Sequence, residues 1–206
     1  GMKSFKRKDG SDPEPPDDDP GNPTVNFHGE KRGNKTHQST TDPDSRLMTK
    51  GKGKEAKLYF TGHVVMENRN GLAVGTCVTT STGTAEREAA LELIGDIPRR
   101  SRITLGGDKG YDVPAFERKL RENGVVPHIA AKISGGGLDA RTTRHATYQI
   151  SQRKRKRVEE IFGWLKTVGM IRKVRHRGLP RVDWVFTFAL AAYNLIRIRN
   201  LSTVPA

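Results

Sequence analysis

The sequence contains a single cysteine, Cys77, among its 206 residues. One thiol cannot form an internal disulfide framework or a cysteine-based zinc site. The six histidines are scattered along the chain and lack the paired helical spacing of a histidine-ligated metal. Together with the scarcity of cysteine, this predicts a protein of the reducing cytoplasm.

Long apolar runs are also missing. The most apolar stretch, from Trp184 to Ile196, is too short to span a bilayer, and Arg197 and Arg199 follow it. No N-terminal segment resembles a secretory signal, so no membrane partner is expected. Hydrophobic residues make up only 33% of the chain, which indicates that part of it contributes little to a core.

Positive charge, by contrast, is abundant. The chain has 37 Lys and Arg against 23 Asp and Glu, which gives a formal net charge of +14. Residues 153–181 hold eleven of these cations and only two carboxylates, Glu159 and Glu160. A soluble protein that is merely basic is the alternative, but so uneven a distribution favours nucleic acid as the partner.

Composition changes near residue 55. Residues 9–23, "DGSDPEPPDDDPGNP", contain six acidic residues and five prolines and are typical of a loop or a disordered arm. We therefore expect residues 1–55 to form an irregular, partly disordered N-terminal segment and residues 56–206 to form the domain.

Residues 56–206 alternate between strand and helix patterns. Strands are predicted at 56–68 and 72–80, joined by the turn "NRNG", and then at 102–107 and 125–132. Helices are predicted at 83–98 with Thr84 as N-cap, at 113–124 ended by Gly124, at 150–169 and at 179–201, while 133–147 reads as a flexible loop. This order predicts an α/β fold, a mixed sheet flanked by helices.

The helix at 150–169 has one apolar stripe, formed by Val158, Ile161, Phe162, Leu165 and Val168. At about 100° per residue, Glu160 lies opposite the stripe, whereas Glu159 lies at its edge in line with Arg155 and Lys166. Trp164 is expected to pack rather than to stack on DNA. Glu159 has two interpretations: an ion pair with Arg155 worth about 0.3 kcal/mol, or a metal ligand on a basic helix.

Asp108 follows the strand at 102–107 in the stretch "RITLGGDKGYD". By itself, an Asp after a strand is typical of a turn or a helix cap. A metal ligand is the alternative, because divalent cations in phosphoryl-transfer sites need hard oxygen ligands.

Two motifs in this sequence resemble those of the DDE transposases of bacterial insertion sequences. "DKGY" matches the D-x-G-Y/F motif of that family with Asp108, Gly110 and Tyr111. Arg155, Glu159 and Lys166 match its R-x3-E-x6-K motif, in the same order and on the expected elements. The resemblance extends over nearly the whole chain, and "ENRNGL", "GTAEREAAL" and "RHRGL" also look like family segments. Gln152 stands where the subgroup often has a Tyr.

The resemblance implies an RNase H-like fold that lacks its first strand, because in relatives the first Asp of the triad precedes the "MKSF" segment. It implies that Asp108 and Glu159 are the catalytic metal ligands, with Mg²⁺ or Mn²⁺ as cofactor. Asp42 and Asp44 are weaker candidates for the first Asp. The implied DNA-binding residues are Arg153, Lys154, Arg155, Lys156, Arg157, Lys166, Lys173, Arg175 and Arg177.

The function implied is that of a DDE transposase fragment, whose intact form performs metal-dependent DNA strand cleavage and strand transfer. The truncated chain itself is expected to be inactive, so its status as an enzyme is open. The alternatives are a non-catalytic DNA-binding remnant or regulator of a full-length transposase, and a pseudogene product without a role. The implied partners are DNA, at transposon ends and target, and a second copy in a homodimer, within the cytoplasm and associated with the nucleoid when bound to DNA.

Overall fold

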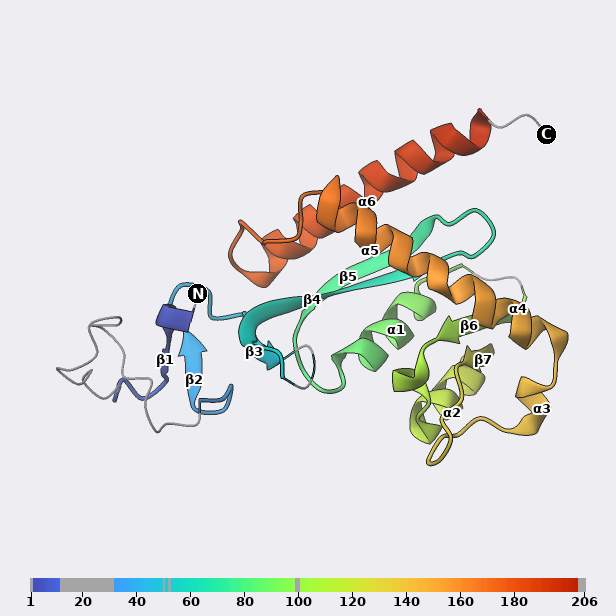
Figure 1. Cartoon of the computed structure of the whole chain (residues 1–206), viewed down its shortest axis with the longest axis horizontal. Helices are drawn as coiled ribbons and strands as arrows, with labels where there is room; N and C mark the ends of the chain where they lie inside the picture. The colour runs from blue at the N-terminus through green and yellow to red at the C-terminus, as the bar shows by residue number, and fades with distance from the viewer. Residues whose placement is uncertain (1, 12–31, 50, 52, 99–100, 204–206) are drawn as a thin grey trace. The chain divides into compact units, whose positions relative to one another are not determined.

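The computed structural model describes residues 2–11, 32–49, 51, 53–98 and 101–203 (Figure 1). Most of the acidic, proline-rich stretch therefore lies outside the described residues. The chain divides into two compact units: unit 1 comprises 1–62, 78–85 and 174–184, and unit 2 comprises 63–77, 86–173 and 185–206. The fold is mixed α/β, as predicted: the described residues form helices and three small sheets, an arrangement compatible with an RNase H-like fold.

Short strands in unit 1 lie where the sequence predicts irregular structure. After the 3₁₀ turn η1 (Met2–Ser4), β1 (Phe5–Arg7) pairs antiparallel with β2 (His37–Ser39). The buried rings of Phe5 and His37 stack with centroids 5.4 Å apart. β3 (Arg46–Thr49) pairs antiparallel with the start of β4 (Ala56–Met66). Strands of three or four residues are too short to show an alternating pattern in the sequence. The domain boundary at residue 55 stays a prediction.

The predicted hairpin is present. β4 is hydrogen-bonded to β3 on one side and to β5 (Ala73–Thr80) on the other. The turn between β4 and β5 is closed by a bond from Glu67 N to Leu72 O, 2.9 Å. The Glu67 carboxylate accepts from three backbone N–H groups of the same turn, those of Arg69, Asn70 and Leu72. A single acidic side chain thus fixes the turn.

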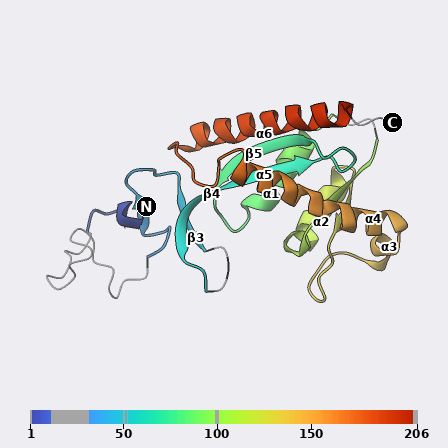
Figure 2. The same ribbon diagram turned by 45° about the horizontal axis from the view of Figure 1, so that its top comes forward.

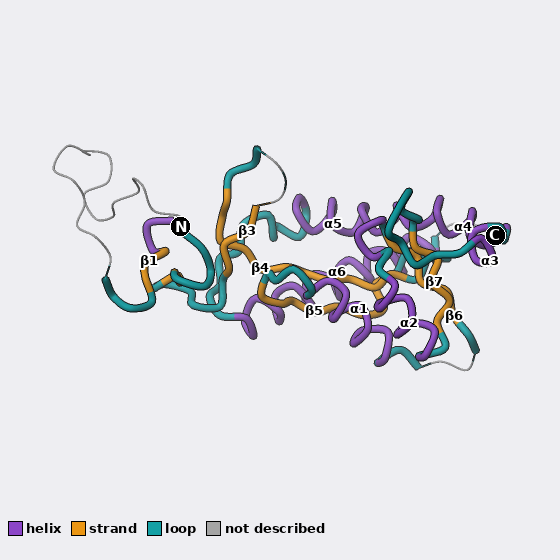
Figure 3. The backbone as a smooth tube through the Cα atoms, turned by 90° about the horizontal axis from the view of Figure 1, so that it is seen from below, coloured by secondary structure: helices purple, strands orange, loops and turns teal. Residues whose placement is uncertain are grey.

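The core of unit 2 lies between a parallel strand pair and two helices (Figure 3). β6 (Ile103–Gly107) and β7 (Val125–Ile129) are parallel, with α1 (Ala85–Gly95) and α2 (Pro114–Glu122) beside them. As predicted, Gly124 ends α2; its φ of +69° is a conformation that glycine adopts without strain. At the start of α1, the N–H of Ala85 donates to the hydroxyl of Thr82. The side chain that accepts from the first turn is therefore Thr82, two residues before the predicted N-cap Thr84. The buried cluster consists of Ile94, Phe116, Leu120, Val125 and Ile129.

The predicted helix at 150–169 is divided into segments. α4 (Ala146–Lys154) begins inside the predicted flexible loop, which also contains α3 (Ala140–Thr143). A 3₁₀ turn, η3 (Arg155–Arg157), then leads into α5 (Val158–Thr167). The run of five consecutive cations, residues 153–157, lies across this junction.

The apolar stripe of α5 is confirmed at Ile161 and Leu165, which are 0% and 2% exposed. The prediction for Val168 is wrong, since 62% of this residue is exposed. α5 ends at Thr167 and Val168 is its C-cap, so the stripe reaches its last residue where the helix stops, and Met170 then takes a positive φ of 55°.

The terminal helix α6 (Leu179–Ser202) forms as predicted. In unit 1, Asp44 Oδ2 accepts from Leu179 N (2.8 Å) and Asp42 Oδ1 accepts from Gly178 N (3.2 Å), so both carboxylates serve the N-terminus of α6. In unit 2, Asn194 donates to Ala73 O and accepts from Ala73 N, which holds α6 alongside β5 (Figure 2). Over the described part of the chain, no helix is both long and apolar enough to cross a bilayer.

Candidate metal and DNA site

Asp108 is exposed and is the first residue after β6. It caps the 3₁₀ turn η2 (Lys109–Tyr111), and its Oδ1 accepts a hydrogen bond of 2.8 Å from Gly110 N. A Cβ on Gly110 would lie 3.0 Å from that same oxygen, so the glycine lets the carboxylate fold back onto the turn. The cap therefore holds one oxygen of Asp108 against the turn.

Tyr111 explains the last position of the "DKGY" motif. Its ring packs against Gly107, where a Cβ would lie 3.5 Å from the ring, and its centroid is 5.6 Å from that of Phe116. Burial raises the pKa of Tyr111 to about 12, and Glu86 and Asp108 act in the same direction. The phenol is therefore neutral and serves as a packing anchor that holds the turn against the core.

The second motif lies next to the end of β6. A Cβ on Gly106 would be 3.4 Å from the Cβ of Arg155, so η3 passes directly over this strand. Asp108 follows Gly106 by two residues, and Glu159 follows Arg155 by four, about one helical turn. The fold thus brings the two motifs, some fifty residues apart in the chain, onto adjoining elements of unit 2.

Gln152, the departure from the family pattern, holds Arg155 in place. It accepts from Arg155 Nε (3.0 Å) and donates to the carbonyl of His128 at the end of β7 (2.6 Å). His128 Nδ1 is 2.7 Å from Ser151 Oγ, and burial, followed by the charge of His145, lowers the pKa of His128. Sequence reasoning missed His128 and Ser151, because neither stands in a spacing that indicates contact.

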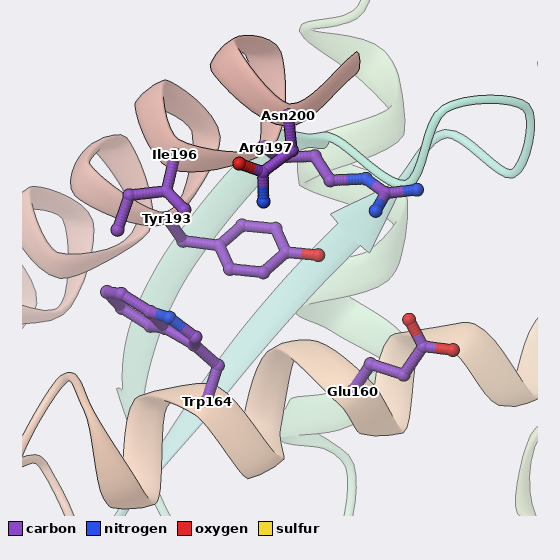
Figure 4. A pocket seen from close by; sticks show the side chains of 6 residues that line it. All are labelled: Glu160, Trp164, Tyr193, Ile196, Arg197 and Asn200. Carbon is purple, nitrogen blue, oxygen red and sulfur yellow. The ribbon is translucent and has the colours of Figure 1, made fainter. Parts of the chain in front are cut away.

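Glu159 and Lys166 are both exposed on α5. Glu160 is exposed as well, and it lines a groove of about 220 Å³ between α5 and the C-terminal half of α6 (Figure 4). Trp164 packs edge-on against Tyr193 there, with centroids 5.6 Å apart, which agrees with the expectation that this indole packs. The remaining lining residues are Ile196, Arg197 and Asn200.

The ligand atoms of the site are of the type that a hard divalent cation prefers, but there are too few of them. Asp108 and Glu159 supply carboxylate oxygens, the ligands that Mg²⁺ prefers. Within the described ranges, however, no group of three or more His, Cys, Asp or Glu side chains is placed to hold a metal ion. Asp42 and Asp44 belong to unit 1, where they cap α6.

The predicted DNA-binding cations differ in their surroundings. Arg153, Lys154, Lys156, Lys166 and Lys173 are exposed in unit 2. Arg157 is only half-exposed: its Nη1 donates to the carbonyls of Asn68 and Arg69, both at 3.3 Å, in the turn between β4 and β5. Arg175 and Arg177 are exposed in unit 1.

These features define a candidate carboxylate site bordered by cations. The family model of the transposase DDE domain matches residues 31–195 of the chain. The chain therefore belongs to the DDE transposase family. No curated protein and no solved structure matches it.

Proposed function

We propose that this chain carries two of the metal-ligating carboxylates of a bacterial DDE transposase, Asp108 and Glu159, and that DNA is its substrate. The observation that supports this is the contact of Arg155 with the end of β6, within a chain whose residues 31–195 match the transposase DDE domain. The reaction of the intact enzyme would be metal-dependent cleavage of DNA strands at the element's ends, followed by strand transfer. The proposal includes a domain that begins near residue 56 and action in the cytoplasm on chromosomal DNA.

Asp108 and Glu159 would hold Mg²⁺ or Mn²⁺. When bound, the ion supplies Lewis-acid stabilisation of the reacting phosphate oxygens. Mg²⁺ demands near-ideal octahedral geometry, so two carboxylates alone give weak binding. We therefore expect little or no strand cleavage by this chain on its own.

DNA would be held by the exposed cations of unit 2 through contacts with phosphates. Arg153, Lys154, Lys156, Lys166 and Lys173 are exposed and available for this role. Arg155 would reach DNA from a position fixed by Gln152. Arg157, Arg175 and Arg177 complete the proposed set, and a homodimer is the proposed acting form.

A non-catalytic DNA-binding regulator of a full-length transposase is the second candidate. It is favoured by the number of carboxylates, since within the described residues Asp108 and Glu159 have no third acidic, His or Cys ligand grouped with them. Both candidates predict DNA binding, and only metal-dependent chemistry separates them.

The first prediction concerns metal binding. Glu159→Gln and Asp108→Asn should each weaken Mn²⁺ binding to the chain at least tenfold, because each removes one of two charged ligands. Isothermal titration or Mn²⁺ electron paramagnetic resonance measures this affinity. Glu160→Gln, one residue along the same helix, is the matched control and should bind Mn²⁺ like the parent. Equal affinity in all four proteins would contradict the assignment of the site.

A nicking assay on supercoiled DNA then distinguishes the two candidates. Cleavage that requires Mg²⁺ or Mn²⁺ and is lost in Glu159→Gln supports an active nuclease. DNA binding without cleavage by the parent chain favours the regulator.

A further inference from the structure

The turn between β4 and β5 is held by more contacts than a hairpin needs to close. We call its four residues the ribbon tip: Asn68, Arg69, Asn70 and Gly71. The Glu67 carboxylate accepts from the second and third N–H groups of the tip, at 2.9 and 2.7 Å, and from Leu72 N at 3.1 Å. Burial acts to raise the pKa of Glu67, but the backbone donors outweigh it and lower the pKa. One charged carboxylate therefore anchors the N–H groups of the turn.

The carbonyl groups of the ribbon tip are anchored from two other elements. Arg157 Nη1, in η3, donates to the first and second carbonyls, both at 3.3 Å. From α6, Arg197 Nε donates to the third at 2.7 Å and the Tyr193 hydroxyl donates to the fourth at 3.1 Å (Figure 4). Each of the four carbonyls thus accepts from a side chain, and all of these residues belong to unit 2.

Gly71 permits this close anchoring for two reasons. Its φ of +79° is a conformation that other residues rarely adopt. A Cβ on Gly71 would also lie 3.0 Å from Arg157 Nη2. The backbone of the ribbon tip is therefore fixed by contacts in which its own side chains take no part.

The three side chains of the ribbon tip, by contrast, are exposed. Within the described residues, the side chains of Asn68, Arg69 and Asn70 make no hydrogen bond or ion pair. A hairpin turn closes through its own backbone geometry, so the additional anchors are not needed for folding the hairpin. A fixed backbone that carries unengaged polar side chains lowers the cost of ordering when those side chains bind a ligand.

Asparagine and arginine are residue types that read DNA bases directly. In the major groove, Asn pairs with N6 and N7 of adenine, and Arg pairs with O6 and N7 of guanine. A two-stranded β-ribbon fits into that groove. Among the described strands, β3 pairs only with the first four residues of β4, so β4 and β5 form a two-stranded ribbon at the tip. Both the shape and the side chains of the tip therefore suit duplex DNA.

The ribbon tip lies beside the candidate metal site within unit 2. The segment η3 contacts both, since Arg155 lies against the end of β6 and Arg157 binds the tip. Glu159 follows Arg157 by two residues. DNA bound at Glu159 would therefore pass close to the tip.

We propose that Asn68, Arg69 and Asn70 are a base-reading element, which contacts the base edges of duplex DNA and determines the sequence that is bound next to the reacting phosphate. This inference rests on the proposed function, because it takes DNA as the substrate. Glu67 and the side chains that bind the carbonyls of the tip are positioning residues, which hold the element in a fixed conformation.

Selection from a library of random DNA duplexes tests the proposal. The parent chain should enrich sequences that share about two or three adjacent base pairs. The preference is then measured as the ratio of dissociation constants for a scrambled duplex and for the most enriched duplex. Arg69→Ala should reduce this ratio about tenfold, and so should the double variant Asn68→Ala/Asn70→Ala. Arg118→Ala, which removes an exposed arginine from α2, is the matched control and should keep the parent ratio.

Binding of the scrambled duplex separates the possible outcomes. It should change little in Arg69→Ala, because contacts with bases and not with phosphates are lost. Equal weakening for both duplexes, with a shallower salt dependence, is the behaviour of a phosphate contact and would overturn the proposal. DNA binding by the parent without any enriched sequence, or a parent-like ratio in the tip variants, would overturn it and leave the proposed function standing. A parent chain that binds no DNA would contradict the proposed function itself and this inference with it.

Glu67→Gln tests the positioning role. The substitution keeps the size of the side chain and all three side chains of the tip, but removes the charge that holds the N–H groups of the turn. The preference ratio should fall, while binding of the scrambled duplex should not weaken. An unchanged ratio would overturn the role of Glu67. Far-ultraviolet circular dichroism and thermal melting verify that each variant folds.

Discussion

At the scale of single residues, the least expected feature is a pair of buried carboxyl groups. Asp112 and Glu117 are 1% and 0% exposed. Asp112 accepts from the backbone N–H of Lys132 (2.5 Å) and of Gly137 (2.8 Å), which holds the loop after β7 against the start of α2. A Cβ on Gly137 would lie 2.9 Å from Glu117 Oε2, so this loop can approach only as glycine.

The charges around the pair decide which carboxyl group keeps its proton. Burial and then the neighbouring Asp112 carboxylate raise the pKa of Glu117 to about 7, with Asp139 contributing in the same direction and Arg121 opposing. Arg121 Nη1 is 3.6 Å from Glu117 Oε2. The backbone N–H donors, which outweigh its burial, lower the pKa of Asp112. Asp112 is thus the charged member of the pair and Glu117 the protonated one below pH 7.

This pair predicts a pH dependence of stability. The unfolded chain releases the Glu117 proton near pH 4.5 and the folded chain near pH 7. Glu117 therefore lowers stability progressively as pH rises from 4.5 to 7, and the loss is complete above pH 7. Glu117→Gln, which resembles the protonated form, should be more stable than the parent at pH 8 by on the order of 2 kcal/mol.

Urea denaturation at pH 4.5, 6 and 8 measures this difference. The gain from Glu117→Gln should shrink toward pH 4.5. The exposed Glu122→Gln on the same helix is the control and should show no such trend. A constant difference between Glu117→Gln and the parent at all three pH values would show that Glu117 does not titrate in this window.

At the scale of secondary-structure elements, the junction of α4 and η3 positions Arg155, four residues before Glu159. Gln152 links Arg155 to the carbonyl of His128, a residue 3% exposed at the end of β7. Gln152→Ala should destabilise the chain by about 1–2 kcal/mol, because a largely buried carbonyl loses its side-chain donor. It should also weaken Mn²⁺ binding, since the segment leading to Glu159 would no longer be tied to β7.

Arg153→Ala is the control for Gln152→Ala, because Arg153 is exposed on the same helix. Its free energy of unfolding should stay within about 0.5 kcal/mol of the parent value. Equal unfolding free energies for the Gln152→Ala chain and the parent chain would show that the link is not structural.

Periodicity predicts the long elements well and the short ones badly. The hairpin, β6, α2 and α6 follow from alternation, capping and helical spacing, and Ile161 and Leu165 are buried as expected. The sequence does not predict β1, β2, β3 or α3, because three or four residues are too few to show a periodic pattern of apolar side chains. The interruption of the helix at η3 is not predicted either, because the spacing of apolar residues says nothing about the contacts of the cationic side chains.

At the scale of the whole molecule, the excess of positive charge should make DNA binding strongly dependent on salt. Lys154→Ala and Lys156→Ala should each reduce the slope of log K against log salt by about 0.9, if each lysine neutralises one phosphate. Arg157→Ala is a useful contrast, because Arg157 donates to the turn between β4 and β5. It should lower the free energy of unfolding by about 1 kcal/mol or more.

Fluorescence anisotropy with a labelled duplex between 50 and 200 mM salt, a range over which such contacts show clearly, measures the slopes. Ser202→Ala, at the end of α6, should leave the slope unchanged. Slopes for both lysine variants equal to that of the parent would remove Lys154 and Lys156 from the DNA interface.

The sequence predicts the family and the order of its motifs, because the chemistry of the site requires particular residue types at fixed spacings along the chain. It does not predict how Asp108 and Glu159 are supported. Tyr111 against Gly107, and Gln152 between Arg155 and His128, are contacts between residues whose separation in the chain carries no regular signal. Such contacts are decided by packing, which a pattern of residue types does not encode.

The division of the chain into two units has a consequence for how the protein can be cut or inherited. The chain passes between the units five times, and β4, β5 and α6 each contribute residues to both. Neither unit corresponds to a continuous segment of the gene. A deletion, a splice or a proteolytic nick cannot release one unit whole, and recombination cannot exchange it, so the two are retained or lost together.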